Sequence, residues 1–166
     1  MTNEAHKPII VCNSGPLIAL VSIDCLYILN RLYQRIIIPN AVYQEVTSSQ
    51  DLTGAQQIAQ EPWIEKKSLN SSSDRLLRAE LGAGESEVIT LAMEIKASKV
   101  LIDERKARRI AKLIYSLSIT GTGGLLLRAK QNDLIKEVRP LLERMKANGY
   151  YLSDRLVSRI AQEAGE

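Results

Sequence analysis

The stretch IIVCNSGPLIAL, residues 9–20, has the pattern of a buried strand that leads directly into a helix. The apolar residues Ile9–Cys12 form the predicted strand, and the polar run Asn13–Pro16 separates it from the helical segment that begins at Leu17. Asn13 therefore stands at the carboxyl end of a strand, where an α/β enzyme of this layout is expected to place an acid. Its amide either belongs to a ligand site or caps the following helix.

The same alternation of short apolar strands and helical patterns continues along the chain. Further strands are predicted at residues 35–38, 63–66 (as an edge strand), 99–102 and 117–120. Helices are predicted at 17–33 (broken near 22–24), 41–46, 81–96, 104–116 and 125–130, and two more between 134 and 166. This order predicts an α/β fold with a mainly parallel sheet covered on both faces. Ligands of such sheets bind outside the carboxyl ends of the strands.

Length and composition indicate an ordinary globular protein. The 166 residues fit one domain over 1–166, with a core at about 9–145 and C-terminal helices within 134–166 packed on it. The N-terminus shows no secretory pattern, and no apolar run approaches the roughly 20 residues that span a bilayer. We therefore expect a cytoplasmic protein without membrane contact, in which Cys12 and Cys25 are small buried hydrophobic residues.

The residue counts exclude several classes of chemistry. The single histidine, His6, lies near the N-terminus, which argues against a Ser-His-Asp or Cys-His site and against zinc. Catalysis would have to come from Asp, Glu, Lys or Tyr. The net charge of +3 is compatible with an anionic partner. Because the chain has no Phe and few aromatic residues, we expect any nucleic-acid contact to be made through phosphates, not through base stacking.

Five acidic residues lie at the end of a predicted strand or within the helices that follow the strands. Asp103 closes the strand at 99–102 and Glu104 follows it, so that both are candidates either for a site or for capping the next helix. Glu85 heads the apolar stripe of its helix, whereas Glu87 falls nearer the stripe's edge. Glu45 lies in the short helix after the second strand. Carboxylates that converge on one edge require a cation, and oxygen ligands favour Mg²⁺ or Mn²⁺.

Basic residues flank this edge. Arg105, Arg108, Arg109 and Lys112 lie on the helix after Asp103. They form either a solvated basic face or a row of contacts to RNA phosphates. The segment TGTGG, residues 120–124, is a possible phosphate cradle at a helix N-terminus, but a structural turn is the favoured interpretation because no Walker lysine follows it.

Five motifs, in this order, resemble the PIN-domain family: NSGPLIAL, IIIPNAVYQEV, LGAGESEVITLAMEI, VLIDERKARRIAK and TGTGGLLLRAK. More narrowly, they look like a poorly characterised branch related to VapC toxins. The resemblance covers roughly residues 9–145. It implies a three-layer α/β/α sandwich, Mg²⁺- or Mn²⁺-dependent endoribonuclease activity, an antitoxin partner and a homodimer.

Carried over residue by residue, the resemblance implies catalytic positions at Asn13, Glu45, Glu85, Asp103 and Glu104. The implied metal ligands are Glu85, Asp103 and Asn13, with Glu87 as the competing alternative to Glu85. Two departures from the family pattern stand out. Asn13 contributes a carbonyl oxygen but no charge, and TGTGG lacks the last acid of active toxins. The expected function is a toxin endoribonuclease, and the alternative is a catalytically weakened module that binds nucleic acid or a protein partner.

Overall fold

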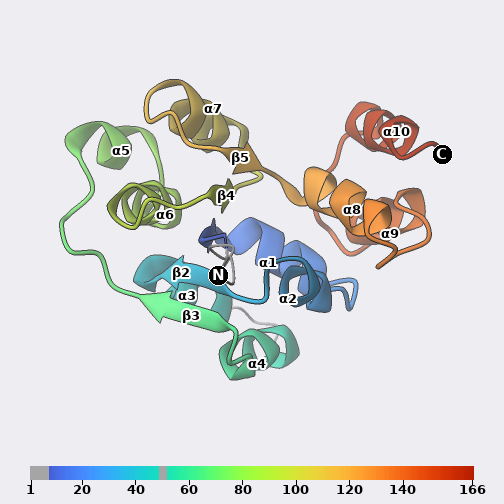
Figure 1. Ribbon diagram of the computed structural model, residues 1–166, viewed down its shortest axis with the longest axis horizontal. Coiled ribbons are helices and arrows are strands. Elements are labelled where there is room, and N and C mark those ends of the chain that lie inside the picture. Colours follow the sequence, from blue (N-terminus) through green and yellow to red (C-terminus); the bar gives the residue numbers. More distant parts are fainter. Residues whose placement is uncertain (1–7, 49–51) are drawn as a thin grey trace, which may run out of the picture.

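The computed structural model describes residues 8–48 and 52–166, so the expectation for His6 lies outside the described residues. Five strands form one parallel sheet in the spatial order β3-β2-β1-β4-β5 (Figure 1). The strands are β1 (Ile10–Cys12), β2 (Ile36–Pro39), β3 (Ile64–Lys67), β4 (Lys99–Leu101) and β5 (Ile119–Thr120). The predicted α/β class with a parallel central sheet is confirmed, and each strand begins or ends within two residues of its predicted limits.

Helices connect the strands and follow the last one. Those before β4 are α1 (Ser14–Val21), α2 (Tyr27–Tyr33), α3 (Asn40–Thr47), α4 (Leu52–Gln60), α5 (Arg75–Glu80) and α6 (Ala83–Glu94). Those after β4 are α7 (Arg105–Leu113), α8 (Thr122–Gln131), α9 (Arg139–Ala147) and α10 (Asp154–Glu163). The sequence patterns did not predict α4. Its mostly polar sequence buries few apolar side chains, among them Ala55 and Ile58, which gives a weak helical period.

Burial along the strands follows their place in the sheet. Every residue of β1 and β2 is buried, because helices cover both faces at the centre. The strand β3 exposes Glu65, Lys66 and Lys67, which agrees with its predicted position at an edge, where charged side chains discourage pairing with another chain.

The helices form two layers around the sheet. In Figure 1, α5, α6 and α7 lie on one side of the strands, and α1 and α2 lie on the other. This arrangement is the predicted three-layer α/β/α sandwich. Across the described ranges, no helix combines the length and the apolar character needed to cross a bilayer. Cys12 and Cys25 are both buried free thiols, as expected.

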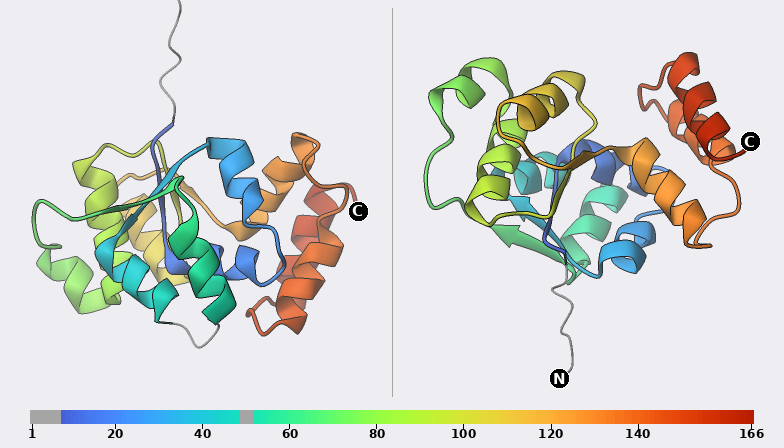
Figure 2. Two further views of the ribbon diagram at one scale, coloured as in Figure 1. Left: turned by 90° about the horizontal axis from the view of Figure 1, so that it is seen from below. Right: turned by 45° about the horizontal axis from the view of Figure 1, so that its top comes forward.

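The last helices stand at one end of the molecule, where Figure 2 shows them in orange and red. Here α9 and α10 pack on each other, and α10 also packs on α8. The contact between α8 and α10 is close at Gly123. A Cβ atom there would clash with the buried Ile160 side chain. We refer to residues 139–163, which comprise α9, α10 and their connection, as the C-terminal arm.

The sheet has one topological switch point, between β1 and β4. The chain proceeds outward from β1 through β2 to β3, then returns to begin β4 on the other side of β1. Cys12 pairs with Leu101 across these two strands, and the Asn13 amide donates to the Leu101 carbonyl at 2.9 Å. The segments that follow β1 and β4 therefore diverge from adjacent points, which creates the crevice where ligands of such sheets bind.

Candidate active site

Asn13 and Glu85 meet at the switch point. Asn13 follows β1 and is 3% exposed, and Glu85 lies in the first turn of α6. The Nδ2 atom of Asn13 donates a hydrogen bond of 3.3 Å to Glu85 Oε1. The Oδ1 atom of Asn13 is buried and has no hydrogen-bond partner among the described residues. Asn13 occupies the N-cap position of α1 but makes no side-chain cap bond, so the capping interpretation is wrong. A buried carbonyl oxygen without a donor costs about 1–3 kcal/mol, which makes this atom a candidate ligand.

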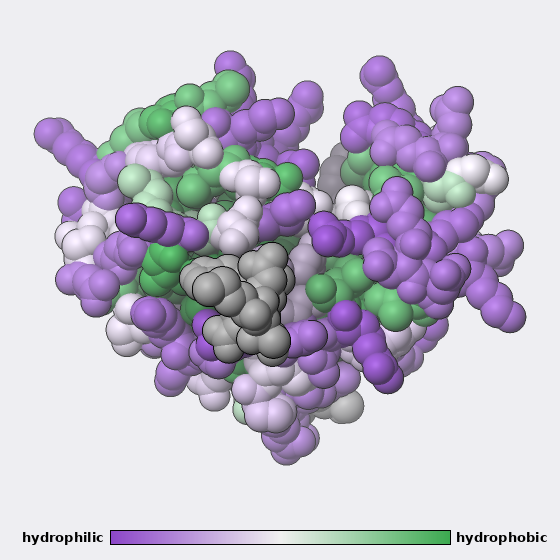
Figure 3. All heavy atoms as spheres, in the orientation of Figure 1, coloured by the Kyte–Doolittle hydropathy of each residue, from purple (hydrophilic) through white to green (hydrophobic). Residues whose placement is uncertain are grey.

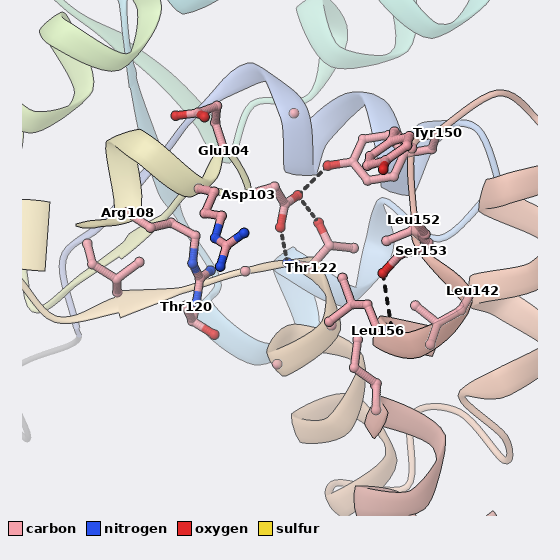
Figure 4. Close-up of a pocket in the computed structure, with 18 of the residues that line it drawn as sticks. Asp103, Glu104, Arg108, Thr120, Thr122, Leu142, Tyr150, Leu152, Ser153 and Leu156 are labelled. Atoms are coloured by element: carbon pink, nitrogen blue, oxygen red, sulfur yellow. Dashed lines mark hydrogen bonds between the residues drawn. The ribbon is translucent and has the colours of Figure 1, made fainter. Parts of the chain in front are cut away.

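The Asp103 side chain accepts three hydrogen bonds. The Thr122 amide donates to Oδ1 at 2.7 Å, and the Thr122 and Tyr150 hydroxyls both donate to Oδ2 at 2.5 Å (Figure 4). Thr122 is the first residue of α8, so the carboxylate lies at a positive helix N-terminus. A Cβ atom at Gly121 would stand 2.7 Å from Asp103 Oδ1, so glycine is required for this approach. The segment 120–124 is thus a turn whose first helical amide is already occupied by Asp103.

Glu104 has a different role from Asp103. Its carboxylate accepts from the Lys106 and Ala107 amides at 3.0 and 2.6 Å and so caps α7. The interpretation that both acids cap this helix is therefore wrong for Asp103. Glu104 still lines the cleft described below, but its oxygens are held by the backbone.

The two candidate acids of α6, Glu85 and Glu87, also have different contacts. The Glu87 carboxylate accepts from the Ala41 amide at 2.9 Å and so anchors the first turn of α3. Glu87 lies outside the cleft that contains Glu85. Glu45 is exposed on α3. Its carboxylate lies close to Gly84: the Oε1 atom is only 2.5 Å from the position that a Cβ atom would take there. Glu45 therefore neighbours the first turn of α6 without lining the cleft.

A cleft of about 1070 Å³ contains Asn13, Glu85 and Asp103. One wall is the amino end of α7, with Arg105 and Arg108, and the opposite wall is the C-terminal arm. Figure 3 shows a notch between the body of the molecule and the arm, with hydrophilic residues on both sides. The structure thus brings six of the predicted site residues into one cavity: Asn13, Glu85, Asp103, Glu104, Arg105 and Arg108.

The basic residues of α7 divide into two groups. Arg105 and Arg108 line the cleft, whereas Arg109 and Lys112 are exposed and lie outside it. The Arg108 Nη1 atom donates to the Ile102 carbonyl at 2.8 Å, beside Asp103. Within the described residues neither Asp103 nor Glu85 forms a salt bridge. The negative charge of the cleft floor is therefore not neutralised by a direct ion pair.

Sequence patterns did not identify four residues that line this cleft. Thr122 lay in a noted motif but was not assigned to Asp103, and Tyr150 lay in a connection between helices. Arg155 and Arg159 on α10 face the cleft from the arm. Their only sequence signal is the spacing of four residues, which places two charges on one helix face.

The environment of Tyr150 keeps it a hydrogen-bond donor. Burial raises the pKa of the Tyr150 hydroxyl well above its usual value, and the negative charge of Asp103 adds to the effect. Burial likewise raises the pKa of the Cys12 thiol, which donates to the Asn13 carbonyl at 3.3 Å. Both groups therefore stay protonated and neutral at neutral pH, and neither adds charge to the site.

The fold and the site together define an α/β protein with carboxylates at the switch point of a parallel sheet. A family model described as "DUF3368: PIN domain" matches residues 9–166. The chain belongs to the PIN-domain family. Comparison with curated proteins and with solved structures finds no match. PIN domains are commonly nucleases and typically use divalent metal ions, so the fold is that of a nuclease family.

In chemical type, the oxygen donors of the cleft suit one hard cation. Within 8–48 and 52–166, no three His, Cys, Asp or Glu side chains are grouped as a metal cluster. Asn13 Oδ1 lacks a donor, Glu85 has Asn13 as its hydrogen-bonding partner, and Asp103 Oδ1 has one lone pair left beside the Thr122 amide. Mg²⁺ is commonly held by one or two carboxylates, with waters and substrate phosphates completing its shell. The donor set meets that need with two carboxylates and one carbonyl oxygen.

We expect the Tyr150→Phe substitution to lower the free energy of unfolding by about 2 kcal/mol, because it removes a hydrogen bond to a partly buried carboxylate. Urea unfolding followed by circular dichroism measures the change. Tyr151→Phe is the matched control, because its side chain is 91% exposed and its hydroxyl has no partner among the described residues. Equal stability of Tyr150→Phe and the natural protein would contradict the assigned contact.

Glu85 and Glu87 of α6 are expected to respond differently to substitution. Glu87→Ala removes the acceptor of the Ala41 amide and should destabilise the fold by about 1 kcal/mol, a usual cost for a lost helix cap. Glu85→Gln keeps an acceptor oxygen for Asn13 and should change stability by less than about 0.5 kcal/mol. Mn²⁺ affinity, measured by calorimetry, should fall in Glu85→Gln alone. A larger loss of Mn²⁺ affinity in Glu87→Ala would reverse the assignment.

Proposed function

We propose that the protein is a metal-dependent endoribonuclease. The observation that carries this proposal is the buried, unpartnered Oδ1 atom of Asn13 beside Glu85, in the same cleft as Asp103. A structural amide in a core would have its oxygen satisfied by a donor. An oxygen without a donor, beside a carboxylate that forms no salt bridge among the described residues, is suited to bind a cation. Membership of the PIN-domain family supports that use.

Each residue of the cleft has a separate task in this proposal. Asn13, Glu85 and Asp103 would hold Mg²⁺ or Mn²⁺. When bound, such an ion supplies a Lewis acid and lowers the pKa of water at the scissile phosphate. Thr122 and Tyr150 fix the orientation of Asp103 through their hydrogen bonds. Arg105 and Arg108 are placed to bind the phosphates of RNA on one side of the acids.

The direct test is cleavage of a structured and an unstructured RNA in Mg²⁺, Mn²⁺ or EDTA. We expect cleavage that depends on the metal and falls at least about 100-fold in Asp103→Asn. Substitution of a residue that only hydrogen-bonds a metal ligand typically lowers metal affinity or activity by roughly 10- to 100-fold, and a ligand itself should matter at least as much. Arg109→Gln is the control, because it alters an exposed arginine of α7 outside the cleft and should keep full activity. Cleavage that persists in EDTA, or in Asp103→Asn, would rule out the proposed metal site.

Specific observations also favour a second candidate, a catalytically weakened module that binds nucleic acid or a protein partner. Asn13 provides no charge, and the turn at 120–124 provides no acid. Asp103 already accepts three hydrogen bonds, so the oxygens that it can offer to an ion are limited. Under this alternative the natural protein would bind RNA or a partner without cutting RNA under any metal condition.

We further propose that the protein is the toxin of a toxin–antitoxin pair, with RNA, an antitoxin protein and a second copy of the chain as partners. The support is the resemblance of its ordered motifs to VapC toxins. Induced expression in a bacterial host should arrest growth, and co-expression of the protein encoded beside it should restore growth. The Asp103→Asn variant, produced at equal level, should not arrest growth. Growth arrest by that variant would separate toxicity from cleavage and contradict the proposal.

A further inference from the structure

The cleft has a second wall that the acidic site does not account for. Arg155 and Arg159 stand one turn apart on α10, so their side chains leave the helix on the same face. Arg155 has no ion-pair partner among the described residues. Arg159 has only Glu163, at 3.9 Å between largely exposed groups, which contributes little. Two cations are therefore available on the arm, opposite Arg105 and Arg108.

Tyr151 lies on the same wall and has a different character. It is 91% exposed, the highest value for any large apolar side chain in the described part of the chain, and it lines the cleft. No hydrogen bond or ring contact of Tyr151 is present among the described residues. Its ring therefore contributes nothing evident to the core, although aromatic residues make up only 4% of this chain.

The backbone at Tyr151 is fixed by its neighbours. Tyr150 is held by its hydroxyl on Asp103 and by its amide, which donates to the Met145 carbonyl at 3.0 Å. Leu152 is buried in the core, and Ser153 caps α10 by accepting from the Leu156 amide at 3.2 Å. Between these anchored residues the Tyr151 side chain is 91% exposed and so points into solvent. Tyr151 thus projects into solvent from a connection whose neighbouring residues are anchored, beside the acidic site.

We propose that Tyr151 stacks on an unpaired base of the RNA while Arg155 and Arg159 bind the adjoining phosphates. This inference rests on the proposed function and names what the arm adds to it. An exposed aromatic face suits base stacking, because its ring makes no other ring contact among the described residues and every base offers a π-face. A base inside a duplex is covered on both faces and cannot use Tyr151. The arm therefore selects single-stranded segments, contrary to the expectation that contacts would be made through phosphates alone.

The test is binding of an unstructured octaribonucleotide and of its duplex, measured by fluorescence anisotropy in EDTA so that no RNA is cut. Tyr151→Ala should weaken binding of the single strand by about 5- to 100-fold, as expected for one lost stacked base, and leave duplex binding unchanged. Tyr151→Trp should retain the affinity, whereas Tyr151→Leu should behave like Tyr151→Ala. A 2-aminopurine base in the octamer should be quenched by the natural protein and not by Tyr151→Ala.

The arginines are tested by the salt dependence of the same binding. Arg155→Gln and Arg159→Gln should each reduce the slope of log affinity against log salt by about 0.7, the value for one phosphate of a single strand. The exposed Arg109→Gln variant is the control and should keep the slope of the natural protein.

The outcomes separate this inference from the proposed function. Cleavage in Mn²⁺ together with undiminished octamer binding by Tyr151→Ala would overturn the stacking role and leave the nuclease intact. If Tyr151→Ala selectively lost single-strand binding but the natural protein did not cleave RNA, the arm's role would be supported and the nuclease proposal would be rejected. If Tyr151→Ala instead lost only the binding of an antitoxin protein, the arm would be a protein interface and the inference would fail.

Discussion

The hydrogen bonding of the Asp103 carboxylate is the constraint on which the site and the C-terminal arm depend. A partly buried carboxylate must be satisfied by donors, and here the donors come from two other parts of the chain. The amide and hydroxyl of Thr122 bring the N-terminus of α8 to the sheet edge, and the hydroxyl of Tyr150 brings the arm to the same point. One side chain thus joins the end of β4, the helix after β5 and the C-terminal helices. The geometry of the acids and the position of the arm are therefore linked.

The charges of the cleft are arranged without direct neutralisation. Arg108 donates to the backbone carbonyl of Ile102, and Glu104 accepts from the amides of α7, so both are held by the backbone. Glu85 accepts from Asn13 beside the open Asn13 Oδ1 atom, and Asp103 lies in the same cleft. Arginines from α7 and α10 stand on the two walls. Carboxylates at the base of the cleft can attract a cation, and the arginines on its two sides can attract phosphates. A polynucleotide bound near a metal ion requires both kinds of charge.

Sequence patterns predicted the framework of the site well. Apolar runs located all five strands, and the rule for parallel sheets placed Asn13 and Asp103 at the same edge. Patterns left alternatives open where two candidate acids lie close together in the sequence. The apolar stripe favoured Glu85 over Glu87, and the partner of each, Asn13 or Ala41, separates their roles. Asp103 and Glu104 are adjacent candidates for a single cap, and their contacts assign it to Glu104.

The sequence by itself determined the alternation of strands and helices, because that alternation follows from local periodicity and burial of apolar side chains. It also determined which acids stand at strand ends. Only the tertiary structure decided which of them converge and what faces them. Tyr150 reaches Asp103 across 47 positions, and Asn13 reaches Glu85 across 72. Such contacts depend on how helices pack after the chain has folded, and no local pattern of one sequence records that packing.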